Sequence, residues 1–150
     1  MKKIEVVKDL TCYLLIFLFT YTGLTKLIDH TVFKSSILQS PIIGNYATLI
    51  SLLIPLLELS IVVMLAFDKY RQKGFLFSLL LMTAFTIYII YMILFIPHLP
   101  CSCGGILKEL SWSNHLLFNS FVILLILVSL LSQNKHKLFI AINRTSRKPV

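Results

Sequence analysis

Four long apolar stretches determine what this chain can fold into. Each contains about 18 to 23 residues, which in an α-helix is roughly 27 to 35 Å, the thickness of the hydrocarbon core of a membrane. The runs LLIFLF, SLLLMTAF and FVILLILV are apolar without interruption, unlike the alternating strands of a membrane barrel. The sequence therefore predicts an all-α polytopic membrane protein, a four-transmembrane-helix bundle with spans at about 10–28, 46–67, 74–96 and 115–132.

The composition argues against a soluble globule. The chain is 57% hydrophobic and 13% charged, against roughly 45–50% and about 25% in an ordinary soluble domain. So few charged side chains cannot cover the surface of a water-soluble chain of 150 residues. The lipid bilayer is therefore an expected partner. We expect one transmembrane domain over residues 1–135 and a basic cytoplasmic tail over residues 136–150.

The basic residues predict an orientation. Lysines and arginines are concentrated before the first stretch, between the second and third, and after the fourth, whereas only Lys26, Lys34 and Lys108 belong to the other side. By the positive-inside rule, both termini are cytoplasmic and the loops at 29–45 and 97–114 lie outside. The formal net charge of +8 is then explained by the orientation of the spans in the membrane. A nucleic-acid partner, which would need one continuous basic face, is not expected.

Glu58 is an acidic residue within the second predicted span. It lies about 18 Å from the outer end of that span, where an unpaired ionised carboxylate costs several kcal/mol. We therefore expect Glu58 to face the bundle interior, either in a helix-to-helix hydrogen bond with Thr83 or Thr86 or in a proton-relay or ligand role. Lys26 is not the expected partner, because it lies about 3 Å from the outer boundary of its span and lysines extend toward the interface.

Two cysteines lie in the second outer loop. Cys101 and Cys103 are separated by one residue and are followed by two glycines. On an oxidising side of the membrane such a pair can close a strained disulfide that is easily reduced. His98 and His115 flank the pair, and a nearby imidazolium favours the reactive thiolate. The third cysteine, Cys12, is expected to be a small apolar core residue about a membrane thickness away.

Three interpretations of the pair stay open. It is a reversible thiol–disulfide site, a permanent disulfide that clamps the loop, or part of a metal site. The metal site would use His98, Cys101, Cys103 and His115, although C-x-C is tighter than the usual zinc spacing. The reversible site is favoured because the thiols are close, external and followed by glycines. Neither a Ser/His/Asp set nor a phosphate-cradling glycine loop indicates hydrolytic or phosphoryl chemistry.

Three segments of the chain resemble the MauE branch of the DoxX-like membrane proteins. They are FTYTGLTKLID, IPLLELSIVVML and CSCGGILKELSWSNHLLFN, and in order they cover about residues 10–132. The resemblance implies that Cys101 and Cys103 form a redox pair and that Gly23, Lys26 and Glu58 belong to a shared membrane framework. It also implies a bacterial inner-membrane protein that works beside a thioredoxin-like partner in the maturation of a disulfide-rich exported protein.

The sequence thus predicts an inner-membrane thiol–disulfide redox protein. It would exchange electrons with an extracytoplasmic thioredoxin-like partner through Cys101 and Cys103, with Glu58 and His115 as further candidate catalytic residues. The alternatives are a non-catalytic assembly or accessory subunit of a larger membrane complex, and a metal-delivery protein. Four-helix thiol oxidases and the vitamin K epoxide reductases pass electrons to quinone, which makes quinone a candidate cofactor by architectural analogy alone. Those proteins use C-x-x-C pairs, and the different C-S-C spacing of this chain argues against direct quinone reduction.

Overall fold

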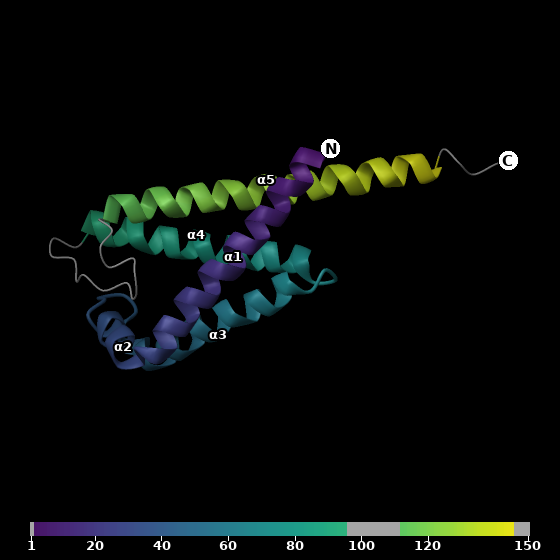
Figure 1. The fold of residues 1–150 in the computed structure, drawn as a ribbon. Helices are drawn as coiled ribbons and strands as arrows, with labels where there is room; N and C mark the ends of the chain where they lie inside the picture. Colours follow the sequence, from purple (N-terminus) through teal and green to yellow (C-terminus); the bar gives the residue numbers. More distant parts are fainter. Residues whose placement is uncertain (1, 96–111, 146–150) are drawn as a thin grey trace.

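The computed structural model describes residues 2–95 and 112–145 of this protein, and they are α-helical almost throughout. The elements are α1 (Lys2–Ile28), α2 (His30–Leu38), the 3-10 turn η1 (Gly44–Tyr46), α3 (Ala47–Ala66), α4 (Arg71–Phe95) and α5 (Trp112–Thr145) (Figure 1). The all-α prediction is confirmed for these residues.

Four segments are long and apolar enough to cross a membrane, and one coincides with each predicted stretch. Tyr13 and Phe17 on α1 and Leu117 on α5 are each 71% exposed on the outside of the bundle. Large apolar side chains in such positions need lipid as their solvent. The protein is therefore a multi-pass membrane protein with four candidate spans: Glu5–Ile28, Gly44–Ala66, Arg71–Phe95 and Asn114–Leu131.

The buried side of each helix follows the helical repeat. Buried positions recur every three or four residues, which places them on one face of the helix. Several of them are small or polar, as is common where membrane helices approach one another closely. On α3 they are Ala47, Ser51, Pro55, Glu58, Ile61 and Leu65, and on α5 they are His115, Asn119, Val122, Ile126 and Ser129.

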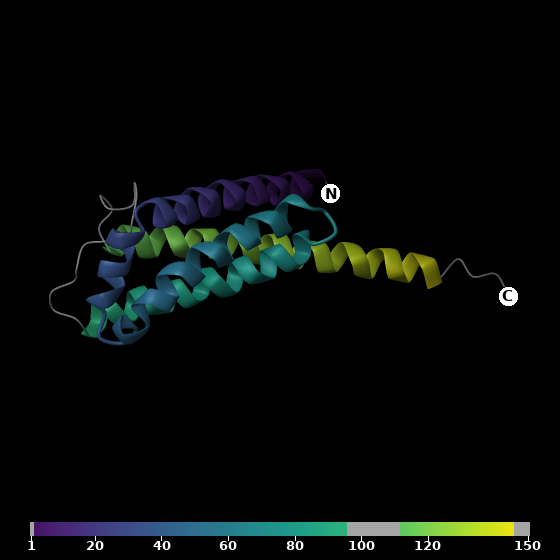
Figure 2. The ribbon, with the colours of Figure 1, turned by 90° about the horizontal axis from the view of Figure 1, so that it is seen from below.

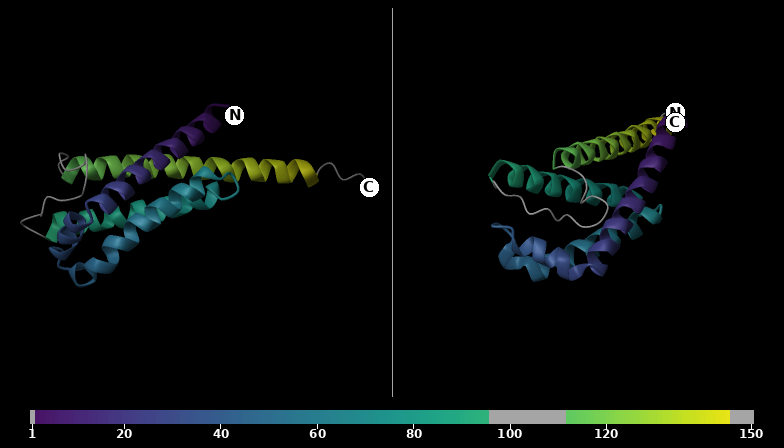
Figure 3. Two further views of the ribbon diagram at one scale, coloured as in Figure 1. Left: turned by 60° about the horizontal axis from the view of Figure 1, so that its bottom comes forward. Right: turned by 60° about the vertical axis from the view of Figure 1, so that its left-hand side comes forward.

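The helices pack as two pairs, α1 with α3 and α4 with α5 (Figures 1 and 2). The start of α1, the α3–α4 turn and the end of α5 lie at one end of the bundle, and α2 lies at the other (Figure 2). At the end where α2 lies, the α4–α5 pair stands apart from α2 and α3 (Figure 3). The four candidate spans agree with the predicted number of crossings, whereas the cytoplasmic placement of both termini stays a prediction.

The segment after α1, predicted to be a loop, forms the short helix α2. The Phe33 amide donates to the carbonyl of Asp29 at 3.0 Å, so the new helix begins directly after α1 ends. His30 Nε2 lies 3.0 Å from the hydroxyl oxygen of Ser51, and this contact fastens α2 to α3. A helix of nine residues is marginal by itself, so packing against α3 stabilises it.

The α3–α4 turn at the opposite end is fixed by Arg71. Its guanidinium donates through Nε to the carbonyl of Leu65 at 3.4 Å and pairs with Asp68 at 2.6 Å and with Asp9 of α1 at 3.5 Å. The turn is therefore held to two helices. Cys12 lies beside it, 3% exposed, with its thiol 3.6 Å from the same carbonyl. Cys12 is thus a core residue, as predicted.

Helix α5 extends beyond its candidate span. The span ends at Leu131, whereas the helix continues to Thr145 and projects from the bundle (Figure 1). The basic tail predicted for residues 136–150 therefore begins within α5 as a continuation of the same helix.

Candidate functional site

Lys26 and Glu58 form an ion pair inside the bundle. Lys26 Nζ donates to Glu58 Oε1, and the two side chains are only 12% and 6% exposed. Glu58 faces the interior, in agreement with the prediction from its depth. The prediction that Lys26 does not reach Glu58 is wrong.

The register of α1 against α3 explains this contact. A Cβ atom on Gly23 would lie 3.5 Å from the Cβ of Glu58, and His30 contacts Ser51. The C-terminal end of α1 at Ile28 is therefore level with Leu53, rather than with Tyr46 as the sequence estimate assumed. This offset is about 10.5 Å along the helix axis, and together with the length of the lysine side chain it brings the ammonium to the carboxylate.

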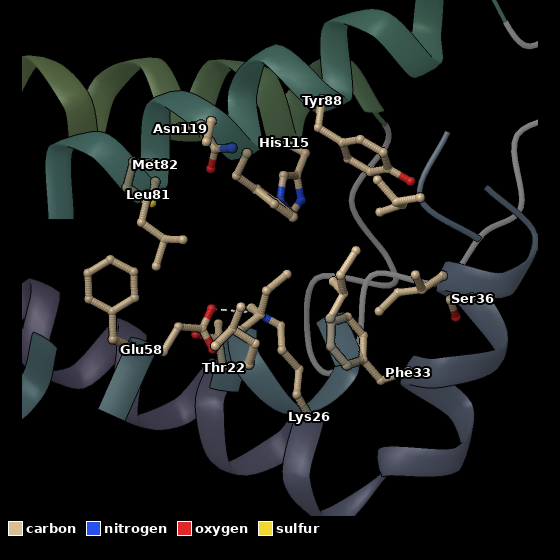
Figure 4. Close-up of a pocket in the computed structure, with 18 of the residues that line it drawn as sticks. Thr22, Lys26, Phe33, Ser36, Glu58, Leu81, Met82, Tyr88, His115 and Asn119 are labelled. Carbon is tan, nitrogen blue, oxygen red and sulfur yellow. Dashed lines mark hydrogen bonds and ion pairs between the residues drawn. The ribbon is translucent and has the colours of Figure 1, made fainter. Parts of the chain in front are cut away.

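The two threonines predicted as hydrogen-bond partners of Glu58 do not bond to it. Thr86 donates to the carbonyl of Met82 in its own helix at 2.7 Å, and Thr83 is exposed. Thr22 of α1 instead lies beside the carboxylate (Figure 4). The threonine prediction is therefore wrong.

Aromatic rings from two other helices surround the ammonium of Lys26. The ring centroid of Phe33, on α2, is 5.5 Å from Nζ, and that of Phe85, on α4, is 5.9 Å away. At these distances the ring faces stabilise a cation. The charge of Lys26 is thus stabilised by the Glu58 carboxylate of α3 and by aromatic rings of α2 and α4.

His115 and Asn119 occupy the same face of α5, one helical turn apart. Their side chains are 6% and 2% exposed, and the His115 ring packs against Phe85 with centroids 5.8 Å apart. The structure thereby brings together two predicted site residues, Glu58 and His115, around one interior space. Cys101 and Cys103, together with His98, lie outside the described residues.

The space between these groups is a cavity of about 400 Å³. Thr22, Lys26 and Glu58 lie on one wall, and His115 and Asn119 lie on the opposite wall (Figure 4). The remaining lining residues are mainly apolar or aromatic: Leu18, Phe19, Phe33, Ser36, Ile37, Ile43, Ile50, Leu53, Ile54, Leu81, Met82, Ala84, Phe85, Tyr88, Met92 and Phe118.

Three polar atoms at this cavity have no hydrogen-bond partner in the part of the chain that the structure describes. They are Thr22 Oγ1, Glu58 Oε2 and Asn119 Nδ2, all of them buried. The Thr22 and Glu58 side chains lie beside each other (Figure 4) and interact, so Asn119 Nδ2 is the most isolated of the three atoms. Buried polar groups are rarely left unsatisfied, because each costs roughly 1–3 kcal/mol. Sequence reasoning missed Thr22 and Asn119, although Asn119 could have been noticed as a polar residue in an apolar span, one turn after His115.

The described residues do not form a metal centre. They contain no group of three or more histidine, cysteine, aspartate or glutamate side chains that could hold an ion. Of the four residues considered for a metal site, only His115 is described, and it faces the interior cavity.

The fold and this cavity define a class of protein, a four-span α-helical membrane protein with a charged pair and a polar cavity in its interior. Residues 4–132 match the family model described as methylamine utilisation protein MauE. The chain belongs to the MauE family, and the predicted resemblance is confirmed. No curated protein and no solved structure shows a significant match to the chain.

The contact between His30 and Ser51 predicts a measurable effect on α2. Replacing Ser51 by alanine is expected to lower the free energy of unfolding by about 1 kcal/mol and to increase proteolysis within residues 29–46, because a buried hydrogen bond is lost. Ser60→Ala is the matched control, since the Ser60 hydroxyl is exposed and donates only to Leu56 of its own helix. Equal effects of the two changes would contradict a tethering role for Ser51.

Proposed function

We propose that this MauE protein is a thiol–disulfide redox protein of the bacterial inner membrane. It exchanges electrons with an extracytoplasmic thioredoxin-like partner through Cys101 and Cys103. The observation that carries the proposal is the family match over residues 4–132, a range that includes the C-S-C pair. The close spacing of the two thiols and the orientation expected from the basic residues support it.

The exchange consists of two thiol–disulfide steps. One thiolate of the pair attacks the disulfide of the partner, forms a mixed disulfide and releases one partner thiolate. The second cysteine then attacks the mixed disulfide, so that Cys101 and Cys103 become disulfide-bonded and the partner leaves as a dithiol. Two electrons and two protons pass to the partner. The reverse sequence oxidises the partner by the same bonds.

Differential alkylation of intact cells tests this proposal. Thiols are labelled with one alkylating reagent before reduction and with a second one afterwards, and the labels on each cysteine are measured by mass spectrometry. We expect Cys101 and Cys103 to change label together when external reductant or oxidant is added. Buried Cys12 serves as the internal control and should keep one label. Thiols at 101 and 103 that never change state would refute the proposal.

A serine substitution separates redox chemistry from an accessory role. We expect the double variant Cys101→Ser/Cys103→Ser to lose thiol exchange completely while still inserting into the membrane. A double variant that leaves the activity of the assembled complex intact would instead identify a non-catalytic subunit. Bound zinc or copper that disappears in His98→Ala would identify a metal-delivery protein.

Glu58 and His115 enter the proposal as supporting groups. Both are titratable and line the interior cavity, so we assign them a part in the proton movements that accompany thiol oxidation and reduction. The variant Glu58→Gln keeps the shape of the side chain and removes its ability to ionise. Full activity of Glu58→Gln would restrict Glu58 to helix packing.

A further inference from the structure

The cavity between the two helix pairs has the size and composition of a small-molecule site. Its volume of about 400 Å³ falls within the range of such sites, which is about 300–1,000 Å³. Its walls are mainly apolar and aromatic, with polar groups on two opposite walls (Figure 4). Sites of this kind hold a ligand by its apolar body and orient it through a few polar contacts.

The wall that carries Glu58 offers a hydrogen-bond acceptor. Glu58 Oε1 accepts from Lys26, whereas Oε2 is buried and has no hydrogen-bond partner in the part of the chain that the structure describes. As the anionic member of an ion pair, the carboxylate can only accept hydrogen bonds. Thr22 lies beside Glu58 and interacts with it, but each carboxylate oxygen can accept about two hydrogen bonds. A ligand therefore needs a hydrogen-bond donor on this side.

The opposite wall offers a hydrogen-bond donor. Asn119 Nδ2 is buried without a partner among the described residues, on a residue that is 2% exposed. Because buried polar groups are rarely left unsatisfied, this wall favours a ligand with an acceptor. Glu58 and Asn119 lie on opposite walls (Figure 4), so the donor and the acceptor of the ligand must be separate groups.

The charges at the cavity favour a ligand without net charge. Lys26 and Glu58 both line the cavity and are paired with each other. An anionic head group would compete with Glu58 for the ammonium, and a cationic one would compete with Lys26 for the carboxylate. Separating the pair in a low-dielectric interior is costly. This disfavours fatty acid anions and the phosphate head groups of ordinary phospholipids.

The cavity opens toward lipid. Leu53 of α3 and Ala84 of α4 both line it and are both exposed. The α4–α5 pair also stands apart from α3 at this end of the bundle (Figure 3). The cavity therefore reaches the outer surface between α3 and α4, which faces lipid in a membrane-spanning bundle. A membrane lipid can place its head group in the cavity while its chain stays in the bilayer.

We propose that this cavity binds an uncharged acylglycerol, a monoacylglycerol or a diacylglycerol of the surrounding membrane. A glycerol hydroxyl donates to Glu58 Oε2, and an ester carbonyl accepts from Asn119 Nδ2. The glycerol unit carries these two groups several bonds apart on one uncharged head, and the acyl chain leaves between α3 and α4. The bound lipid thereby links α3 to α5. The site is formed by residues of the helices and does not involve the thiol chemistry of the proposed function.

Three uncharged lipids with the same chain test the two hydrogen bonds. Monooleoylglycerol has the hydroxyl and the carbonyl, oleyl alcohol lacks the carbonyl, and methyl oleate lacks the hydroxyl. Their saturable binding to the full-length protein in phosphatidylcholine nanodiscs is measured against protein-free nanodiscs, which report partition into the bilayer. We expect monooleoylglycerol to bind about tenfold more tightly than either control, because each control loses one hydrogen bond. Equal affinities would show a site for chains alone and would overturn the proposal.

Dioleoylglycerol distinguishes the two acylglycerols. It keeps a hydroxyl and two ester carbonyls but adds a second chain, which must also leave between α3 and α4. Saturable binding of either acylglycerol above both controls supports the proposal, and the acylglycerol that binds more tightly is the preferred ligand. Saturable binding of neither would overturn it.

A substitution of Asn119 locates the binding. Asn119→Leu keeps the approximate size of the side chain and removes the donor. We expect it to weaken the binding of monooleoylglycerol about tenfold and to leave that of oleyl alcohol unchanged. The control Ser120→Ala changes an exposed neighbour that donates to Leu116 of its own helix, and it should bind as the unaltered protein does. Unchanged affinity for monooleoylglycerol in a folded Asn119→Leu protein would overturn the assignment.

A pair of substitutions on α4 tests the same site should Asn119→Leu fail to fold. Ala84→Phe narrows the opening toward lipid and is expected to weaken the binding of monooleoylglycerol. Thr83→Phe is the matched control, because Thr83 is an exposed neighbour that is not among the lining residues of the cavity. If both variants bind monooleoylglycerol as the unaltered protein does, the lipid does not enter between α3 and α4, and the proposal is overturned.

Discussion

Replacing Lys26 by methionine is expected to destabilise the protein by about 3–5 kcal/mol, because it leaves the carboxylate of Glu58 buried without its counter-ion. Glu58→Leu should cost a similar amount for the converse reason. The double variant Lys26→Met/Glu58→Leu removes both charges and should recover most of the loss, since apolar side chains of similar size often replace a buried ion pair at little cost. The coupling between the two sites is therefore expected to be large.

Reversible unfolding in mixed micelles by added sodium dodecyl sulfate, followed by circular dichroism, measures these free energies. Lys73→Met is the matched control, because Lys73 is exposed near the start of α4, and it should change the stability by less than about 0.5 kcal/mol. If the effects of the two single variants simply add in the double variant, the pair is not an interacting unit.

Enlarging Gly74 should have the second largest effect. A Cβ atom at this position would lie 2.9 Å from Leu65 Cδ2 and 3.1 Å from the Leu65 backbone nitrogen, so α4 would have to move away from α3. Gly74→Leu is therefore expected to cost about 1–3 kcal/mol, even though leucine favours helix more than glycine does. The same unfolding measurement tests it.

Two further variants show whether this cost comes from the helix contact. Ala66→Leu adds similar bulk at an exposed position beside the same turn and should be nearly neutral. Gly23→Ala should cost less than Gly74→Ala, because its new methyl group would meet the side chain of Leu59 at 3.3 Å, and a side chain can move more easily than backbone. A Gly74→Leu protein as stable as Ala66→Leu would contradict the close packing of α3 and α4.

The number and length of the spanning helices could be predicted from sequence because lipid imposes both. An uninterrupted apolar run of about 20 residues has few alternatives in a membrane. Helix α2 could not be predicted in the same way. Its sequence HTVFKSSIL is too short and too polar to signal a helix, and the helix is stabilised by packing against α3 that only the folded chain provides.

The candidate site was predictable only in part. The depth of Glu58 in its span correctly placed it in the interior, because a carboxylate avoids lipid. The identity of the ion-pair partner of Glu58 depended on the axial offset between α1 and α3. The lengths of the apolar stretches do not give this offset, so the prediction that Lys26 does not reach Glu58 was wrong. Asn119 and Thr22 were missed because the rotation of a helix, and hence which polar residues face a cavity, is set by packing. The resemblance to the MauE family was carried by short motifs and was confirmed by the match over residues 4–132.

The position of α2 links two properties of the interior. Phe33 of α2 is one of the rings beside the Lys26 ammonium, and Phe33, Ser36 and Ile37 also close one end of the cavity. A displacement of this nine-residue helix would therefore alter the surroundings of the buried charge and the size of the cavity in a single movement. Whatever contacts α2 from outside the membrane can thereby influence the centre of the bundle without entering it.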